Sequence, residues 1–246
     1  MQIGILIIGD EILSGRRQDK HLAYVIKTLA ERHLNLAWAR YVGDDELNLV
    51  DSFRDIAARG DLCFSFGGIG ATPDDITRQC VASALNLPFV RHPGAVEEIE
   101  GQFGDKAYPD RIRMADLPQD AGLIPNPRNR IPGFSVGHIH CLPGFPELAW
   151  PMLEWVLENH YPELRGIETV HYILKVHNAH ESELIVLMEQ VQRDHPTLRV
   201  SSLPRFLDNG QSEIELGFKG DEASANAAYN AIATELQQRG LAVSEV

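Results

Sequence analysis

The sequence predicts an α/β protein whose first two-thirds form a domain with a doubly wound, mostly parallel sheet. Three observations lead to this fold class. Short apolar runs alternate with amphipathic helical segments over the first 165 residues, as they do in β-α-β units. Three of the apolar runs are followed by loops that carry both glycine and aspartate. The pattern changes after Arg165-Gly166, which indicates a second domain.

The elements of the first half follow from hydrophobic periodicity. The run from Gln2 to Gly9 is short and rich in isoleucine, as is typical of a buried strand. A polar loop over 10–20 leads to a segment with apolar residues at helical spacing. These residues are Leu22, Val25, Ile26 and Leu29. We then expect a strand over 36–42, a helix with Leu47, Val50, Phe53 and Ala57 on one face, a strand over 62–66, a helix over 75–85 and a short strand over 88–91.

The rest of the first domain is less regular. Residues 94–120 are predicted to form a helix followed by a polar segment without regular structure, which we call the irregular excursion. A strand over 136–142 and a helix over 147–160 follow, and Tyr161-Pro162 ends that helix.

The second domain is predicted to be a small α+β unit with the order β-α-β-β-α. We place the domains at 1–166 and 167–246. The predicted elements are a strand over 169–176, a helix with Leu184, Ile185, Met188 and Val191, a strand over 198–206, a turn at 208–210, a strand with Ile214, Leu216 and Phe218, and a helix capped by Asp221.

Charge and composition exclude several functions. The formal net charge of −13 argues against nucleic-acid binding, which needs basic patches. No apolar run approaches the length of a membrane span, and the start of the chain lacks the features of a signal peptide. The three cysteines lie far apart, which suggests a reducing compartment and packing roles. We therefore expect a soluble cytoplasmic protein without a membrane partner.

The segment from Gly67 to Thr77 is the most informative, because it joins a buried strand to a helix. Gly67, Gly68 and Gly70 let the backbone turn tightly and approach a ligand closely. The free N–H groups of such a turn and the helix dipole favour an anion. The alternative is an ordinary tight turn in which Asp75 caps the helix. The residues alone leave both interpretations open.

Acidic residues follow two other strands of the same sheet edge. Asp44 lies in Gly43-Asp44-Asp45, where Asp44 or Asp45 is also suited to cap a helix. If Asp44 and Asp75 face the same edge, they can share a divalent metal ion. Asp10, Glu11 and Asp19 have the same ambiguity.

Later loops carry proline and glycine, and the histidines and cysteines show no catalytic arrangement. Pro125-Asn126-Pro127 and the segment from Leu142 to Pro146 are either stiff connections or the walls of a pocket. His138 and His140 alternate on the predicted strand over 136–142, where a surface or core role is favoured. No hydrolase triad is apparent.

Taken together, these loops resemble the molybdopterin-binding family, which includes molybdenum-cofactor biosynthesis proteins and the N-terminal part of the competence/damage-inducible, or CinA-type, proteins. The motifs that carry the resemblance cover residues 1–165. They are the segment from Gly9 to Gly15, Asp19, Val42-Gly43-Asp44, Gly67-Gly68-Ile69-Gly70 with Asp75, and the loops at 125–127, 132–134 and 142–146. The small second domain is also similar to that of CinA-type proteins.

The resemblance implies a three-layer α/β domain that binds a small phosphorylated ligand, either a pterin such as molybdopterin or a nucleotide. It assigns Asp44 and Asp75 to catalysis and to a magnesium ion. Family members associate as dimers or trimers, so a homo-oligomer is expected. The ligand-binding residues that it implies are Gly9, Asp10, Glu11, Gly15, Gly67, Gly68, Gly70, Thr72, Asp74, Asn126, Pro143 and Gly144.

Three hypotheses for the function remain open at this stage. The first is a protein that binds a phosphorylated pterin or a nucleotide. The second is a magnesium-dependent pyrophosphatase that hydrolyses ADP-ribose or a related dinucleotide, as some CinA-type relatives do. The third is a non-catalytic oligomeric module.

Overall fold

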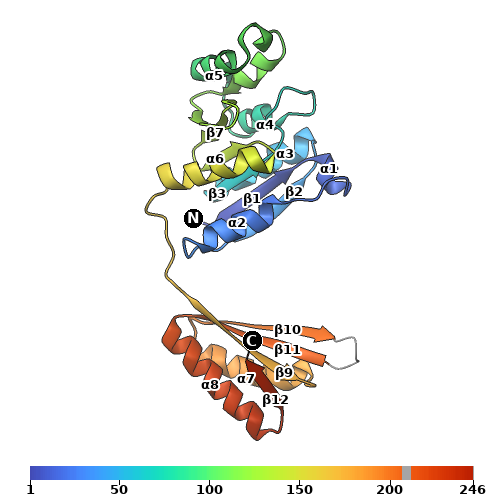
Figure 1. Ribbon diagram of the computed structural model, residues 1–246, viewed down its shortest axis with the longest axis vertical. Coiled ribbons are helices and arrows are strands. Elements are labelled where there is room, and N and C mark those ends of the chain that lie inside the picture. The colour runs from blue at the N-terminus through green and yellow to red at the C-terminus, as the bar shows by residue number, and fades with distance from the viewer. Residues whose placement is uncertain (207–211, 246) are drawn as a thin grey trace. The chain divides into compact units, whose positions relative to one another are not determined.

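The computed structural model describes residues 1–206 and 212–245 (Figure 1). The chain divides into two compact units, Met1–Gly166 and Ile167–Val246. The turn expected at 208–210 lies outside the described residues. Nowhere in the described part is there a helix long and apolar enough to cross a membrane.

A six-stranded, mostly parallel sheet organises the first unit, in the order β2-β1-β3-β8-β7-β6. The neighbouring strands β2, β1, β3 and β8 run parallel, β7 pairs antiparallel with β8, and β6 pairs antiparallel with β7. This arrangement confirms the predicted fold class. The strands are β1 (Ile3–Ile8), β2 (Trp38–Val42), β3 (Leu62–Phe66), β6 (Gly122–Ile124), β7 (Gly133–Val136) and β8 (Ile139–Leu142).

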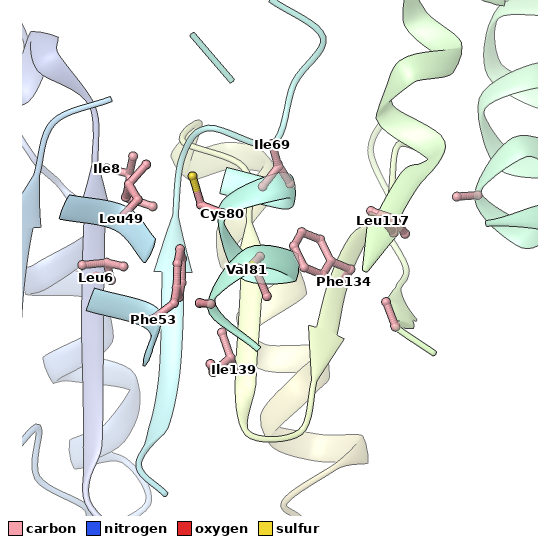
Figure 2. Close-up of a cluster of buried hydrophobic side chains, with 14 of the residues drawn as sticks. Leu6, Ile8, Leu49, Phe53, Ile69, Cys80, Val81, Leu117, Phe134 and Ile139 are labelled. Atoms are coloured by element: carbon pink, nitrogen blue, oxygen red, sulfur yellow. The ribbon is translucent and has the colours of Figure 1, made fainter. Parts of the chain in front are cut away.

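Helices cover both faces of this sheet and give three layers (Figure 1). All residues of β1 are buried, and they alternate between two cores. Leu6 and Ile8 pack with α3 (Glu46–Arg59) and α4 (Thr77–Ala84), as Figure 2 shows. Their neighbours in β1 pack on the other face with α2 (His21–Ala30) and α6 (Pro146–Asn159). Burial on both faces explains why the strand sequence is uniformly apolar.

The irregular excursion contains a small sheet of its own. Strands β4 (Phe89–Arg91) and β5 (Asp116–Pro118) pair with each other and not with the main sheet. Between them lie α5 (Pro93–Phe103) and two 3-10 helices, Gly104–Ala107 and Arg111–Ala115. Buried residues of this excursion, such as Ile99, extend the α3/α4 core.

Two predicted elements differ in the structure. The strand expected over 136–142 is the β7–β8 hairpin, in which Val136 pairs with Ile139. Its two-residue turn begins at Gly137, whose φ of +57° is natural for glycine in a hairpin. The polar loop expected over 10–20 begins with a short helix, α1 (Asp10–Leu13).

Some residues of the predicted helical faces point to solvent. Ile26 in α2 and Leu47 in α3 are exposed. The buried face of α3 consists of Leu49, Phe53 and Ile56. The predicted face of α3 was therefore wrong at Leu47, which stands in the first turn, and at Ala57, which is exposed while the neighbouring Ile56 is buried.

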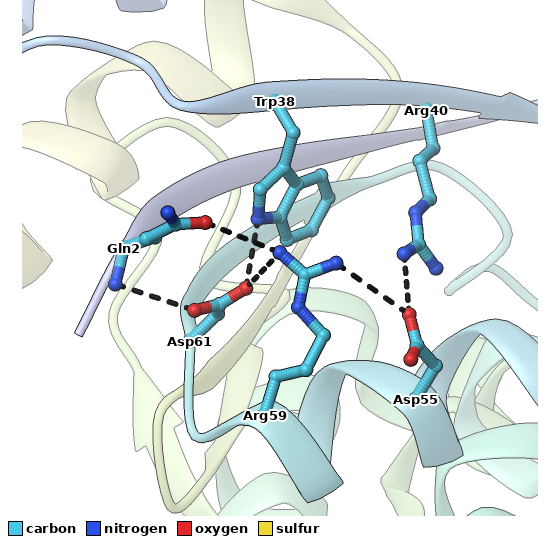
Figure 3. A network of polar contacts seen from close by, with 6 residues as sticks. All are labelled: Gln2, Trp38, Arg40, Asp55, Arg59 and Asp61. Atoms are coloured by element: carbon cyan, nitrogen blue, oxygen red, sulfur yellow. Dashed lines mark hydrogen bonds and ion pairs between the residues drawn. The ribbon is translucent and has the colours of Figure 1, made fainter.

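A polar network closes the amino-terminal end of the parallel sheet (Figure 3). The buried carboxylate of Asp61 accepts hydrogen bonds from Trp38 Nε1 at 2.9 Å and from the backbone N–H of Gln2 at 3.2 Å. Arg59 pairs with it at 2.7 Å. Burial by itself would raise the pKa of Asp61, but these hydrogen bonds and the arginine outweigh it and hold the pKa below its usual value.

The second unit is an antiparallel sheet in the order β10-β11-β9-β12 with two helices. Apolar residues of the strands and of both helices form one core. Asp221 caps α8 as predicted, with its carboxylate accepting from the Ser224 N–H at 2.9 Å. The final strand was not predicted, because it is short and only partly apolar. The elements are β9 (Val170–His177), α7 (Glu181–Asp194), β10 (Arg199–Phe206), β11 (Ser212–Gly220), α8 (Glu222–Gln238) and β12 (Ala242–Glu245).

Candidate functional site

The loops that follow β1, β3 and β8 meet at the carboxyl edge of the sheet, where α/β proteins bind ligands. These three strands are direct neighbours. The loops surround a cavity of about 460 Å³, which we call the loop cavity. The lining residues are Ile8, Gly9, Glu11, Arg17, Asp44, Gly67, Gly68, Ile69, Gly70, Ala71, Thr72, Asp74, Asp75, Met114, Asn126, Asn129, Ile131, Pro143, Gly144, Phe145 and Leu148.

Glycine is required at the start of the loop after β3. Gly67 and Gly68 have φ values of +111° and +67°, which favour glycine. A Cβ at Gly68 would lie 2.2 Å from Thr77 Oγ1. Thr77 in turn donates its hydroxyl to the Gly67 carbonyl at 3.0 Å and its backbone N–H to the Gly68 carbonyl at 3.0 Å. The loop is therefore fixed to the first residue of α4.

Four consecutive N–H groups of this loop, those of residues 68–71, have no acceptor among the described residues. All four residues line the loop cavity. Backbone N–H groups that converge in a turn form a concave site for an anion. This property arises from the backbone, so it does not require basic side chains.

Asp75 belongs to the loop and does not cap the helix that follows. Its Oδ2 accepts from the Thr72 N–H at 2.9 Å and from the Thr72 hydroxyl. The residue at the N-cap of α4 is Ile76, which makes no side-chain cap. The alternative in which Asp75 is a helix cap is therefore wrong.

A buried arginine fixes the far end of the loop. Arg78 donates Nη2 to the Gly70 carbonyl at 2.7 Å and Nη1 to the Asp116 carbonyl at 3.1 Å. It also donates to the carbonyl of Arg113. Arg78 thus ties the loop to the excursion between β4 and β5.

Asp10 and Asp44 join the loops after β1 and β2. The Asp10 N–H donates to Asp44 Oδ2 at 3.0 Å, and the Asp44 N–H donates to Asp10 Oδ1 at 3.2 Å. Partial burial raises the pKa of Asp44 and the nearby carboxylates raise it further, although the hydrogen bond from Asp10 opposes them. The cap of α3 is the neighbouring Asp45, which accepts from the Asn48 N–H at 2.9 Å.

The loop cavity brings together most of the residues singled out from the sequence. Asp10 and Gly15 do not line it. Asn126 lines it but is buried, with its amide group accepting from the Arg128 N–H and donating to the Ile131 carbonyl. The predicted residues that line it are Gly9, Glu11, Asp44, Gly67, Gly68, Gly70, Thr72, Asp74, Asp75, Asn126, Pro143 and Gly144.

Sequence reasoning missed Arg17, which is the one lysine or arginine among the described residues lining the loop cavity. Its guanidinium lies 5.6 Å from the centre of the Phe145 ring and 3.7 Å from the Glu11 carboxylate. Its position in a polar loop without periodicity gives no signal of this role.

The remaining ambiguous residues have structural roles. Asp19 lies one residue before Lys20, the N-cap of α2, and accepts from the N–H groups of His21 and Leu22 at 2.8 and 3.1 Å, which pairs two N–H groups of the first turn of α2. His140 is fully buried between Ser135 and Tyr161. The three cysteines are free and buried.

The fold and the cavity define an α/β domain of the kind that binds small ligands. A family model described as a probable molybdopterin binding domain matches residues 4–165. The chain belongs to this family, as its loop motifs predicted.

Two curated relatives and one solved structure illustrate the similarity. A CinA-like protein of Anaeromyxobacter sp. (strain K) is 36% identical over 167 residues, which are 65% of this chain but only 41% of that protein. A protein of Pyrobaculum aerophilum is 30% identical over 213 residues, 82% of this chain and 79% of its own length. The crystal structure of the protein CinA of unknown function from Thermoplasma acidophilum superposes with a TM-score of 0.59 at 27% identity, covering 65% of this chain and 98% of that one.

Proposed function

We propose that the loop cavity binds the phosphate of a phosphorylated pterin, such as molybdopterin, or of a nucleotide. The observation that carries this proposal is the set of unpaired N–H groups at residues 68–71, all in residues that line one cavity. Unpaired donors at fixed positions bind a phosphate oxygen without having to reorganise. Membership of the molybdopterin-binding family supports the same ligand class.

The charge of the cavity supports a role for a divalent cation. Four carboxylates line it, from Glu11, Asp44, Asp74 and Asp75, against the single guanidinium of Arg17. A phosphate entering this cavity would be repelled unless a cation offsets the carboxylates. Among the described residues, no group of three or more His, Cys, Asp or Glu side chains is arranged to hold a metal ion. Magnesium commonly uses only one or two carboxylates together with phosphate oxygens and water, and Asp44 and Asp75 would serve in this way.

A second candidate function is a magnesium-dependent pyrophosphatase acting on ADP-ribose or a related dinucleotide. The observation that favours it is that carboxylates and unpaired N–H groups line the same cavity. A cation held by the carboxylates would neutralise charge on the diphosphate and lower the pKa of a bound water. The N–H groups would stabilise the phosphate that leaves.

The deciding experiment measures AMP release from ADP-ribose by the purified protein, with magnesium and with EDTA. Release that depends on magnesium supports the pyrophosphatase. Saturable binding of ADP-ribose without release supports a binding protein. If neither occurs in a folded protein, molybdopterin is titrated next. Only a folded protein that binds neither ligand class would leave the oligomeric module, which the mass of the protein in solution would test.

A further inference from the structure

The sheet of the second unit carries a serine, a histidine and a glutamate in one chain of contacts. Ser244 Oγ lies 2.9 Å from His177 Nε2, and His177 Nδ1 lies 3.5 Å from Glu213 Oε2. The three side chains come from the neighbouring strands β12, β9 and β11. A hydroxyl, an imidazole and a carboxylate in this order are the parts of a hydrolase triad, which is recognised by geometry and not by sequence position.

The register of the sheet brings these residues together. Glu213 pairs with His177 across β11 and β9, and Ser244 pairs across β12 and β9 with Lys175, which precedes His177 by two positions. Side chains two positions apart in a strand point to the same face, so all four residues share one face of the sheet. The alternate residues of β9 and β11 pack in the core with α7 and α8. The group therefore lies on the sheet face opposite the two helices.

Glu213 sets which nitrogen of His177 carries the proton. Its side chain is buried, and its other oxygen, Oε1, lies 3.3 Å from Lys175 Nζ. Because a carboxylate only accepts, a carboxylate facing Nδ1 favours the tautomer with the proton on Nδ1. Nε2 is then the acceptor, and the Ser244 hydroxyl donates to it. This is the tautomer in which an imidazole can take the proton of a serine.

The group is accessible and has a cation beside it. The side chain of His177 is 34% exposed, and Ser244 is partly exposed. Lys175 stands opposite Ser244 on the neighbouring strand, where its ammonium is suited to stabilise negative charge on the oxygen of an attacked carbonyl. The contact between His177 and Glu213 is long for a hydrogen bond, and such contacts in catalytic groups often tighten only when substrate binds.

We propose that Ser244, His177 and Glu213 form a second site of this protein, which hydrolyses small carboxylic esters. Ser244 Oγ attacks the carbonyl carbon while His177 Nε2 takes the hydroxyl proton, and the proton then passes to the alcohol that leaves. Water next attacks the acyl-serine with His177 again as the base, which releases the acid and restores the hydroxyl. The reaction consumes only water. All of these residues belong to the second unit, so the site is independent of the loop cavity.

A fluorophosphonate probe tests the nucleophile, because it labels activated serine hydroxyls covalently. The full chain is incubated with the probe, and peptide mass spectrometry locates the label, which we expect on Ser244. Ser244→Ala should stay unlabelled. Ser201→Ala is the matched control, since Ser201 lies on the same sheet face but on β10, at the opposite edge from β12, and it should be labelled like the wild type. A folded protein without label on Ser244 would overturn the proposal.

Turnover is measured with p-nitrophenyl acetate. Exposed imidazoles also cleave this ester slowly, so the rate of Ser244→Ala gives the background. Ser244→Ala and His177→Gln should each lower kcat by about a hundredfold, and Ser201→Ala should not change it. Equal rates in Ser244→Ala and the wild type would show that the site is not a hydrolase, even if the probe labels the serine.

Glu213 acts through His177 and is a positioning residue. Glu213→Gln should lower kcat and leave KM for the ester unchanged, because an amide can also donate and no longer favours one tautomer. A variant that loses thermal stability but keeps kcat would show that Glu213 only supports the sheet. None of these variants should change the binding of ADP-ribose, so the failure of either proposal leaves the other intact.

Discussion

Asp10 and Asp44 each accept the backbone N–H of the other, at 3.0 and 3.2 Å. This reciprocal pair joins the loops after two neighbouring parallel strands, β1 and β2. A Cβ at Gly43 would lie 2.4 Å from Asp10 Oδ1, so a side chain there would displace the Asp10 carboxylate from its bond to the Asp44 N–H. Asp10 thus holds Asp44 at the cavity without lining the cavity itself.

We expect Asp75→Asn to abolish magnesium-dependent binding of ADP-ribose, or its hydrolysis, and to leave the fold intact. The asparagine oxygen can still accept from the Thr72 N–H, so the loop keeps its shape while the charge that would hold the cation is lost. Calorimetry and circular dichroism test the two parts. Asp45→Asn is the control, because Asp45 caps a helix and does not line the cavity. Unchanged activity in Asp75→Asn would refute the metal role.

Gly68→Val should remove phosphate binding. The new side chain would clash with Thr77 Oγ1, and the left-handed backbone would add a strain of about 1–3 kcal/mol. Gly60→Val has nearly the same φ, +65°, with no atom within 4 Å of the new Cβ. It should lose stability but keep its affinity for pyrophosphate. Equal affinities in the two variants would contradict the phosphate-loop proposal.

The order of elements and the loops at the carboxyl edge could be predicted because they depend on local pattern. Alternation of apolar runs and helical segments determines the parallel sheet, and glycine next to aspartate marks the loops. The β7–β8 hairpin could not be predicted in the same way, because Gly137-His138 interrupts an otherwise continuous strand pattern. Residues from separate loops and helices, such as Arg17 and Leu148, reach the loop cavity only through tertiary packing.

Whether Asp75 caps the helix or closes the loop could not be decided from the sequence either. The answer depends on which residue first adopts helical dihedral angles, and a shift of one position changes the partner of the carboxylate. Asp45 and Asp221 cap their helices, whereas Asp75 turns back to Thr72.

Asp61→Asn should cost about 1–3 kcal/mol of unfolding free energy at pH 7, because it removes the charge from a buried hydrogen-bonded group. The folded pKa of Asp61 lies below 3.8, so its stabilisation is present above that pH and is lost as the pH falls through the folded pKa. Urea unfolding at pH 7 and pH 3 should show the difference between variant and wild type shrinking at the lower pH. The exposed Asp55→Asn should cost less than about 1 kcal/mol.

His140→Gln should make the protein less sensitive to acid. Burial, and to a lesser extent the neighbouring His160 and His138, lowers the pKa of His140 to about 3. The unfolded chain therefore takes up this proton first, and stability falls as the pH decreases from about 6.5 towards 3. The expected contribution is about 1.4 kcal/mol per pH unit within that window. Urea midpoints from pH 7 to pH 4 should fall less steeply in the variant, and parallel slopes would show that His140 is not the group responsible.

The parallel pairing of β1 with β3, and of β3 with β8, has a consequence for folding. The loops that meet at the cavity start near residues 9, 67 and 143, so no contiguous fragment shorter than about 135 residues contains all three. Contacts between such distant segments form only when much of the chain has become ordered. Ligand affinity would therefore report the complete folding of this unit. On refolding, the affinity should return together with the sheet. A collapsed intermediate in which β8 has not yet paired with β3 should not bind the ligand.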